Sequence, residues 1–217
     1  MNINILAGGP EQYLPKQEEL DFTNEWWVGV DRGVHTLLKF GIVPMAAFGD
    51  FDSVSESELI EIQKKLQKLH IFPSEKNETD LEIAFNWALT QKPRTINIYG
   101  ATGGRIDHLM GNIQLLAAND FLEREERPEV YIIDNKNKLT VLPPGSYDVK
   151  QEPGMKYISF VPVTEEVKGL TLTGFKYPLE NSHIKRGSTL CISNELISDY
   201  GNFSYSDGIL MVISSSD

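Results

Sequence analysis

The sequence predicts an α/β domain with a mostly parallel sheet, followed by a small antiparallel β-sandwich domain. Up to about residue 135, short apolar runs alternate with segments of helical periodicity, the order expected of a parallel sheet covered by helices. After Lys136-Asn137-Lys138 the pattern changes to short strand-like runs separated by turn residues. We therefore expect two domains, residues 1–137 and 138–217.

Five apolar runs in the first domain are continuous rather than alternating in polarity, which is typical of strands buried on both faces of a parallel sheet. These predicted strands are Ile3–Ala7, Trp27–Val30, Met45–Phe48, Thr95–Tyr99 and Val130–Ile133. Apolar residues at helical spacing lie between them. The spacing predicts helices from the capping-box pattern Ser55-Glu56-Ser57-Glu58 to about His70, over Leu81–Leu89 and over Ile106–Ala117.

The second domain contains no long helical pattern. Its strand-like runs are bounded by turn signals such as Pro143-Pro144-Gly145 and Asp207-Gly208, and this regular spacing favours an antiparallel sandwich. The predicted strands are Leu139–Leu142, Tyr157–Val161, Leu170–Leu172, Thr189–Ile192 and Ile209–Ile213.

Composition excludes several classes of protein. The single cysteine, Cys191, excludes an internal disulfide framework and a Cys-rich zinc site. The formal net charge of −11 argues against a general nucleic-acid binder, because phosphate backbones are held mainly by Lys and Arg. No run approaches the roughly 20 apolar residues of a membrane span, and the N-terminus lacks a basic leader. We expect a cytoplasmic protein without nucleic-acid or membrane partners.

Acidic side chains follow the predicted strands of the first domain. Asp50 and Asp52 come directly after one strand, Asp80 opens one helix and Asp107 opens another. Carboxylates gathered at the strand ends of an α/β sheet suggest a Mg²⁺–nucleotide site, since Mg²⁺ takes oxygen ligands alongside phosphates. The alternatives are an Asx turn or helix cap at Asp50 and Asp52, and simple capping at Asp80.

The segment Gly100-Ala101-Thr102-Gly103-Gly104-Arg105 joins a predicted strand to a predicted helix. Such a turn can direct backbone N–H groups toward a phosphate, which Arg105 could bind bidentately. The segment lacks the Gly-Lys-Ser/Thr ending of a Walker A loop, so alone it is a weak signal. His108 is more typical of a surface or structural histidine.

Five motifs follow one another along the chain: Gly29-Val30-Asp31-Arg32-Gly33, Gly49-Asp50-Phe51-Asp52-Ser53, Glu75-Lys76-Asn77-Glu78-Thr79-Asp80, Gly103-Gly104-Arg105-Ile106-Asp107-His108 and Ser193-Asn194-Glu195. In this order and spacing they closely resemble the bacterial thiamine pyrophosphokinase family, and the resemblance extends over nearly the whole chain. It implies a Rossmann-like N-terminal domain, a C-terminal β sandwich and a homodimer with its active site at the subunit interface.

The reaction implied by the resemblance transfers the terminal pyrophosphoryl group of ATP to the hydroxyethyl oxygen of thiamine, giving thiamine diphosphate and AMP. Asp50, Asp52 and Asp80 are expected to coordinate Mg²⁺ directly or through water. Asp52, Asp80 and Asp107 are the expected catalytic residues. Asp107 is expected to orient the thiamine hydroxyl rather than deprotonate it, because a carboxylate with a pKa near 4 is a weak base for an alcohol.

The resemblance also implies binding residues in both domains. The nucleotide or its phosphates would contact Asp31, Gly103, Gly104, Arg105 and Asp107. The thiamine ring system would contact Ser193 and Asn194 of the partner subunit, although a polar turn between strands is the simpler interpretation without the resemblance.

Two further features of the sequence concern the metal and the thiamine. Asn77 stands where the family usually has an aspartate, so this position brings no charge to a metal. No aromatic residue is singled out as the one that stacks on thiamine; the candidates are Trp26, Trp27, Trp87, Tyr200 and Phe203. The alternative functions are a pyrophosphokinase for another alcohol, a Mg²⁺-dependent nucleotide hydrolase, and a non-catalytic thiamine or nucleotide sensor.

Overall fold

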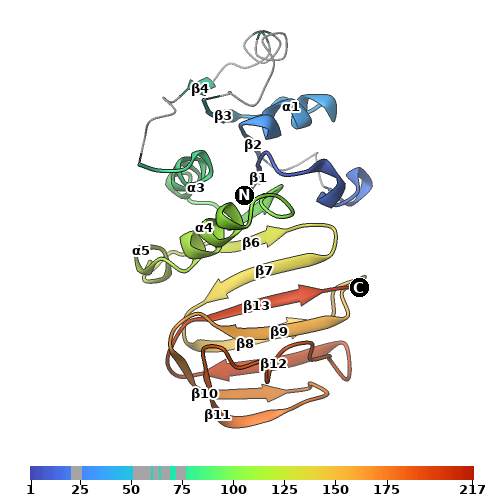
Figure 1. The fold of residues 1–217 in the computed structure, drawn as a ribbon, viewed down its shortest axis with the longest axis vertical. Helices are drawn as coiled ribbons and strands as arrows, with labels where there is room; N and C mark the ends of the chain where they lie inside the picture. Colours follow the sequence, from blue (N-terminus) through green and yellow to red (C-terminus); the bar gives the residue numbers. More distant parts are fainter. Residues whose placement is uncertain (21–25, 51–59, 61–63, 65–68, 72–76) are drawn as a thin grey trace. The chain divides into compact units, whose positions relative to one another are not determined.

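The computed structural model describes residues 1–20, 26–50, 60, 64, 69–71 and 77–217 (Figure 1). The chain divides into two compact units. The first comprises residues 1–115 and 124–135, and the second comprises residues 116–123 and 136–217. Within the described ranges, no helix is both long and apolar enough to cross a membrane.

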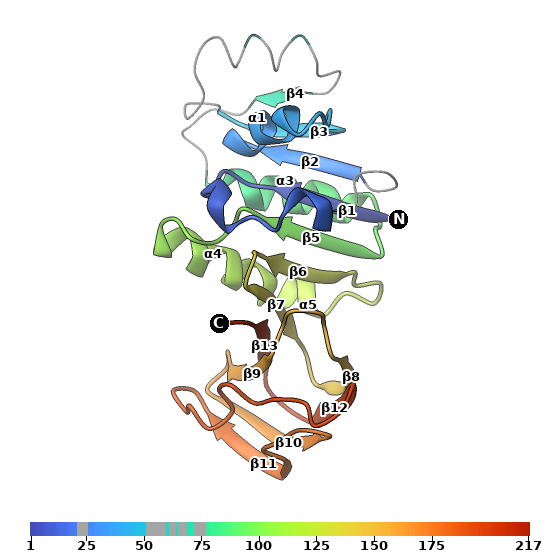
Figure 2. The same cartoon turned by 90° about the vertical axis from the view of Figure 1, so that its right-hand side faces the viewer.

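The first unit is built on parallel strands in the order β4-β3-β2-β1-β5-β6 (Figure 2). Their bounds are β1 Asn2–Leu6, β2 Trp26–Val30, β3 Ala46–Gly49, β4 Leu69–Ile71, β5 Thr95–Tyr99 and β6 Glu129–Ile133. The chain moves outward from β1 to β4 and then returns to the other side of β1 as β5. This reversal is a topological switch point, where ligands bind at the carboxyl ends of the strands.

Helix α1 (Arg32–Lys39) follows β2, α3 (Asp80–Thr90) follows β4, and α4 (Ile106–Leu116) follows β5. Burial of β1 and β2 is nearly continuous along each strand, as expected of a sheet covered on both faces. Trp27 stacks on Tyr99 with ring centroids 5.6 Å apart, in a cluster with Leu6, Leu14 and Leu37. Two 3₁₀ turns, Glu11–Tyr13 and Gln17–Glu19, lie between β1 and β2.

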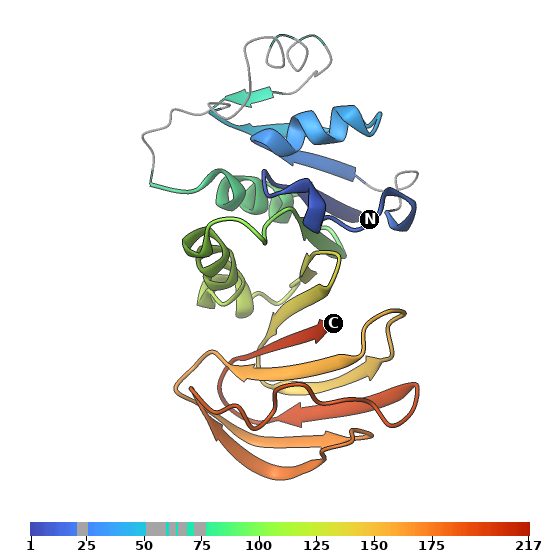
Figure 3. The same ribbon diagram turned by 45° about the vertical axis from the view of Figure 1, so that its right-hand side comes forward.

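The second unit contains two antiparallel layers (Figure 3). One has the order β7-β13-β9 and the other β11-β10-β12-β8. The bounds are β7 Asn137–Leu142, β8 Gly145–Lys150, β9 Tyr157–Pro162, β10 Glu166–Thr173, β11 Leu179–Lys185, β12 Tyr200–Tyr205 and β13 Leu210–Ser215. Both layers contribute to one buried core: Phe160 of β9 packs on Phe203 of β12 with ring centroids 5.0 Å apart. The predicted fold class is confirmed.

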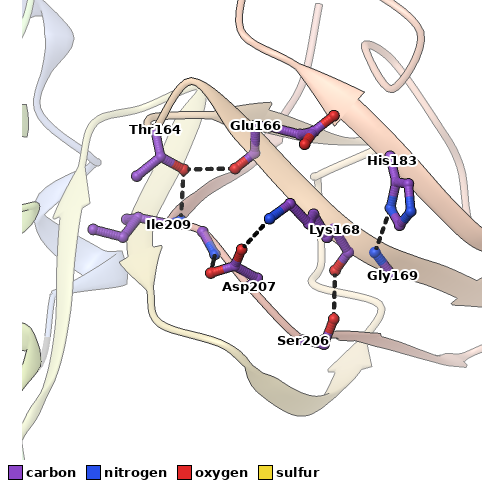
Figure 4. Close-up of polar contacts among 9 residues, drawn as sticks. Thr164, Glu166, Lys168, Gly169, His183, Ser206, Asp207 and Ile209 are labelled. Carbon is purple, nitrogen blue, oxygen red and sulfur yellow. Dashed lines mark hydrogen bonds and ion pairs between the residues drawn. The ribbon is translucent and has the colours of Figure 1, made fainter.

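Side-chain hydrogen bonds and an ion pair stabilise the irregular segments around β10 in the second unit (Figure 4). The Thr164 hydroxyl donates to the Glu166 carbonyl and accepts the Ile209 N–H, both at 2.9 Å. Lys168 of β10 pairs at 2.8 Å with Asp207, which lies in the connection between β12 and β13. These bonds satisfy polar groups where β10 departs from regular pairing.

Two element predictions are wrong. Thr189–Ile192 is a turn, although its apolar residues read as a strand. Leu190 and Ile192 are exposed while Cys191 is buried, and the segment meets β9 through single bonds, one of them from Phe160 N–H to the Cys191 carbonyl at 3.0 Å.

The helix predicted to reach about His70 lies mostly outside the described residues; of it, Ile60 and Lys64 are helical. Its end is placed too late, because β4 begins at Leu69 and pairs in parallel with β3. A few apolar residues cannot distinguish the last turn of a helix from a short buried strand. Five further elements were not predicted from the sequence: α1, β8, β11, β12 and the short helix α5 (Asn119–Leu122).

Candidate active site

The switch point of the first unit is formed by the ends of β1 and β5, which approach each other through their backbones. Ala7 N–H donates to the Tyr99 carbonyl and Gly9 N–H to the Gly100 carbonyl, both at 2.8 Å. A Cβ added at Gly9 would lie 2.3 Å from the Gly100 carbonyl oxygen. Only glycine fits at this contact, so the two strand ends are fixed closely side by side.

Asp31 links the ends of β2 and β3. Its N–H donates to the Phe48 carbonyl at 2.9 Å, and its backbone has φ = 49°, an uncommon conformation for a residue other than glycine. A Cβ at Gly49 would lie 2.1 Å from Asp31 Oδ1. The Asp31 carboxylate therefore packs against the strand end that carries half-buried Asp50. Asp52 lies outside the described residues.

Asp80 is the first residue of α3, but it is not the cap of that helix. Thr79 is the cap, and its hydroxyl accepts the Glu82 N–H at 3.2 Å. The alternative interpretation of Asp80 as a helix cap is therefore wrong, because Thr79 caps the helix. The position of Asp80 in the first turn still agrees with the helix dipole, which favours a negative charge there.

Carboxylate oxygens are the donor type that Mg²⁺ prefers, so Asp31, Asp50 and Asp80 suit that ion chemically. Within the part of the chain that the structure describes, no three acidic, histidine or cysteine side chains gather closely enough to form a metal site. The predicted magnesium group includes Asp52, which falls outside that part.

At the start of α4, Arg105 and Asp107 form an exposed two-point ion pair. Arg105 Nε and Nη2 donate to the two carboxylate oxygens at 3.1 and 2.5 Å, and the His108 N–H donates to Oδ1 at 3.0 Å. The hydrogen bond from Arg105 lowers the pKa of Asp107 and raises that of Arg105. While it is paired with Arg105, Asp107 is therefore a weaker base than an unpaired carboxylate.

The two glycines before Arg105 differ in their surroundings. Gly103 has φ = 75°, and a Cβ there would lie 2.1 Å from the Tyr13 ring. At Gly104 the nearest atom to an added Cβ is the Pro10 Cδ at 3.8 Å, an ordinary van der Waals contact, so a side chain fits there. Gly103 is therefore required by the packing of the loop, whereas Gly104 leaves its backbone accessible.

In the second unit, Asn194 is buried and its amide is committed to protein groups. Its side chain is 2% exposed. The amide oxygen accepts the N–H groups of Tyr177 and Glu195 at 3.0 and 2.9 Å, and the amide nitrogen donates to the Tyr177 carbonyl at 2.9 Å. Ser193 is exposed, with φ = 56°, and its N–H donates to the Ser159 hydroxyl at 2.9 Å.

This network brings Tyr177, which the sequence analysis missed, beside the predicted thiamine-binding residues. Its ring is 58% exposed, and the neighbouring Lys176 pairs with Glu195 at 2.9 Å. Of the five aromatic candidates, Trp27 and Phe203 are buried in the cores and Trp87 packs on Phe48, while Trp26 is half-buried and Tyr200 is exposed. Only the order Lys176-Tyr177-Pro178, an aromatic residue before a turn proline, hints at Tyr177 in the sequence.

Comparison with known proteins gives two matching family models. Residues 18–131 match the thiamin pyrophosphokinase catalytic domain, and residues 146–210 match the thiamin pyrophosphokinase vitamin B1 binding domain. The chain is 48% identical over 215 residues to a Bacillus subtilis protein named thiamine pyrophosphokinase, covering 99% of both chains.

Solved structures agree with this similarity. The crystal structure of thiamine pyrophosphokinase from Bacillus subtilis matches with a TM-score of 0.91 at 47% identity and covers 100% of both chains. That of thiamin pyrophosphokinase from Geobacillus thermodenitrificans matches with a TM-score of 0.90 at 50% identity, covering 100% of this chain and 98% of the other.

Proposed function

The chain belongs to the thiamin pyrophosphokinase family, and from that premise we propose which of its residues bind the metal, ATP and thiamine. It transfers the pyrophosphoryl group of ATP to the hydroxyethyl group of thiamine, giving thiamine diphosphate and AMP. The observation that carries this function is the 48% identity to the Bacillus subtilis relative over 99% of both chains. The predicted ATP-binding role of residues 1–137 and thiamine-binding role of residues 138–217 remain part of the proposal.

Product analysis tests the function directly. Phosphorus NMR of a reaction with ATP, thiamine and MgCl₂ should show equal amounts of thiamine diphosphate and AMP, without accumulation of ADP. A parallel reaction without thiamine should leave ATP intact. Nucleotide breakdown in that control would indicate a hydrolase, and ADP with thiamine monophosphate would indicate transfer of a single phosphoryl group.

The metal site of the proposal consists of Asp50, Asp52 and Asp80, with the Asp31 carboxylate packed beside the same strand end. Bound Mg²⁺ would neutralise the charge on the phosphate oxygens. The carboxylates themselves would fix the position of ATP at the switch point, and positioning is the larger part of catalysis in phosphoryl transfer. Asn77 would contribute at most a neutral oxygen.

In the proposed reaction Arg105 would bind a phosphate of ATP, and Asp107 would bind the thiamine hydroxyl. A phosphate can replace the carboxylate as the partner of the Arg105 guanidinium, since both present two acceptor oxygens in a plane that the fork matches. Asp107, released from this pair, would accept a hydrogen bond from the thiamine hydroxyl and hold it in line with the β phosphorus. The backbones of Gly103 and Gly104 would lie against the phosphates.

The thiamine-binding part of the proposal is changed by the second unit's geometry. Because the Asn194 amide already bonds to Tyr177 and Glu195, we assign it the task of holding the Tyr177 segment. Ser193 and the exposed Tyr177 ring would contact thiamine themselves. A tyrosine face attracts a cation, and the thiazolium ring of thiamine carries a positive charge.

Exposed apolar side chains flank the proposed site residues in both units, which supports a homodimer with shared sites. On α4, Ile106 is 75% exposed and Met110 is 50% exposed, on either side of Asp107. Near Ser193, Ile197 is 71% exposed. Large apolar residues on the surface beside functional groups are typical of an interface, and a symmetric dimer would bury both sets at once.

A mixing experiment tests the shared site. Chains with Asp52→Asn and chains with Tyr177→Ala, each impaired alone, would form hybrids with one intact site if the two residues act across the interface. With random pairing about half of the dimers are hybrids, so about a quarter of the wild-type activity should return. No recovery, despite subunit exchange seen by native mass spectrometry, would place both residues in the same chain's site.

We also propose that the enzyme is cytoplasmic, because a single cysteine is typical of proteins from a reducing compartment.

A further inference from the structure

The loop of residues 100–105, which carries the proposed phosphate contacts, is anchored by a buried carboxylate from the next strand. Asp134 directly follows β6 and is 8% exposed. Its Oδ2 accepts the Thr102 hydroxyl at 2.8 Å. Burying a carboxylate is unfavourable in free energy unless its oxygens are hydrogen-bonded. The bond to Thr102 therefore contributes to the fold, unlike an exposed hydrogen bond that water can replace.

The residue after Asp134 anchors the facing segment. Asn135 donates its N–H to the Tyr13 carbonyl at 2.8 Å and its side-chain amide to the Gln12 carbonyl at 3.1 Å. The Tyr13 ring in turn packs against Gly103, leaving no room for a Cβ there. The packing of Gly103 on Tyr13 is therefore held from both sides. Asp134 bonds to Thr102, next to Gly103, and Asn135 bonds to the segment that carries Tyr13.

The other end of loop 100–105 is fixed by different groups. The Asn112 amide nitrogen, from α4, donates to the Ala101 carbonyl at 3.2 Å, and the Gly100 carbonyl is bonded to Gly9. Between these anchors and Arg105, Thr102 is the last residue whose side chain is tied to the body of the unit. The Thr102 bond and the packing of Gly103 on Tyr13 thus set the direction in which Gly104 and Arg105 leave the sheet.

We infer that Asp134 is a positioning residue for the reaction, which acts through Thr102 to hold loop 100–105 in the conformation that receives the ATP phosphates. This inference rests on the proposed function of the loop. Asp134 does not itself bind phosphate: its side chain is buried, and a carboxylate repels the phosphate oxygens. Its contribution is to fix the backbone, because a small displacement of a binding group is costly in phosphoryl transfer.

The experiment compares Thr102→Val, which removes the hydroxyl at nearly constant shape, with Thr102→Ser, which keeps it. Calorimetry with ATP and MgCl₂ gives Kd, and steady-state assays give kcat and the KM for each substrate. In Thr102→Val the Kd for ATP should rise about tenfold, the scale of one lost hydrogen bond, and the KM for thiamine should not change. Thr102→Ser should stay within about twofold of the wild type.

Coupling to the carboxylate is measured by adding Asp134→Ala, which removes both acceptor oxygens, to each Thr102 variant. If Asp134 acts through Thr102, the substitution weakens ATP binding in the Thr102→Ser background and adds little in Thr102→Val. Melting temperatures separate this from a general loss of stability, which would affect both substrates equally. If Asp134→Ala does not fold, the comparison of valine with serine at position 102 decides alone.

Equal Kd values for ATP in Thr102→Val and Thr102→Ser would overturn the inference, as would equal losses toward ATP and thiamine. Failure of the proposed function has a different signature. In that case the wild type makes no thiamine diphosphate, while the Kd for ATP still reports whether Thr102 and Asp134 set the loop.

Discussion

Loop 100–105 of the first unit and the turn at residues 189–196 of the second carry proposed site residues of one reaction, but they are held in different ways. The loop is fixed at its start by bonds to the Gly100 and Ala101 carbonyls, by the Thr102 hydroxyl on Asp134 and by the close contact at Gly103. The turn is fixed by backbone bonds to β9 and by the buried Asn194 amide, which bonds to Tyr177 and Glu195. In the loop the anchoring groups precede the proposed phosphate contact of Arg105, whereas in the turn a residue expected to bind thiamine is itself an anchor.

The largest expected effect is at the strand end of the first unit. Asp52→Asn should lower kcat at least about 100-fold, because a preorganised charged group in phosphoryl transfer is commonly worth that much. Turnover is measured at saturating ATP and MgCl₂, and folding by circular dichroism. Asp120→Asn, an exposed acidic residue on α5, is the matched control and should retain full activity. A folded Asp52→Asn enzyme within a few-fold of wild type would remove Asp52 from the site.

Substitutions at Asn194 and Ser193 distinguish an effect on stability from an effect on thiamine binding within the turn. Asn194→Ala leaves the Tyr177 and Glu195 backbone groups without their amide partner, so the free energy of unfolding should fall by about 2–3 kcal/mol. Ser193→Ala removes an exposed hydroxyl and should change it by less than about 0.5 kcal/mol. Urea titrations measure both, and the KM for thiamine should rise in both. A stable Asn194→Ala protein would show that the amide is not needed for the fold of this segment.

The corresponding pair in loop 100–105 is Gly103 and Gly104. Gly103→Ala places a Cβ against the Tyr13 ring at a positive φ, and it should cost about 1–2 kcal/mol of stability as well as weaken ATP binding. Gly104→Ala places a Cβ in ordinary contact with Pro10 at 3.8 Å, and its effect on thermal unfolding should be several times smaller. Differential scanning calorimetry of the two variants makes the comparison. Equal destabilisation would mean that Tyr13 moves aside without cost.

What the sequence could predict depends on whether the signal is local. The strand Thr95–Tyr99 coincides with β5, because a short β-rich apolar run bounded by turn residues is a local pattern. Thr189–Ile192 has a similar apolar content but is a turn, since its surroundings, not its composition, decide its backbone. The same holds for the site: the acidic clusters are visible in the sequence, but the bond between Thr102 and Asp134 joins residues 32 positions apart and needs the sheet order to be known.

The smallest effect concerns two exposed ion pairs, Arg105–Asp107 in the first unit and Lys176–Glu195 in the second. In each, a hydrogen bond from the cation lowers the pKa of the carboxylate. The carboxylate therefore stays ionised as the pH falls, and loses its charge only when the pH reaches the lowered value. Arg105→Gln should raise the pKa of Asp107 toward its ordinary value of about 3.9.

NMR titration of the side-chain carboxyl carbons measures both groups in one protein, so each pair is the control for the other. Arg105→Gln should leave the pKa of Glu195 unchanged, and Lys176→Gln should raise that of Glu195 but not that of Asp107. Adding ATP with MgCl₂ to the wild type sharpens the comparison. If phosphate takes Arg105 away from Asp107, the pKa of Asp107 shifts while that of Glu195 does not, because only the first pair lies in the proposed phosphate loop. An unchanged Asp107 titration at saturating ATP would show that Arg105 keeps its carboxylate partner and does not bind the nucleotide.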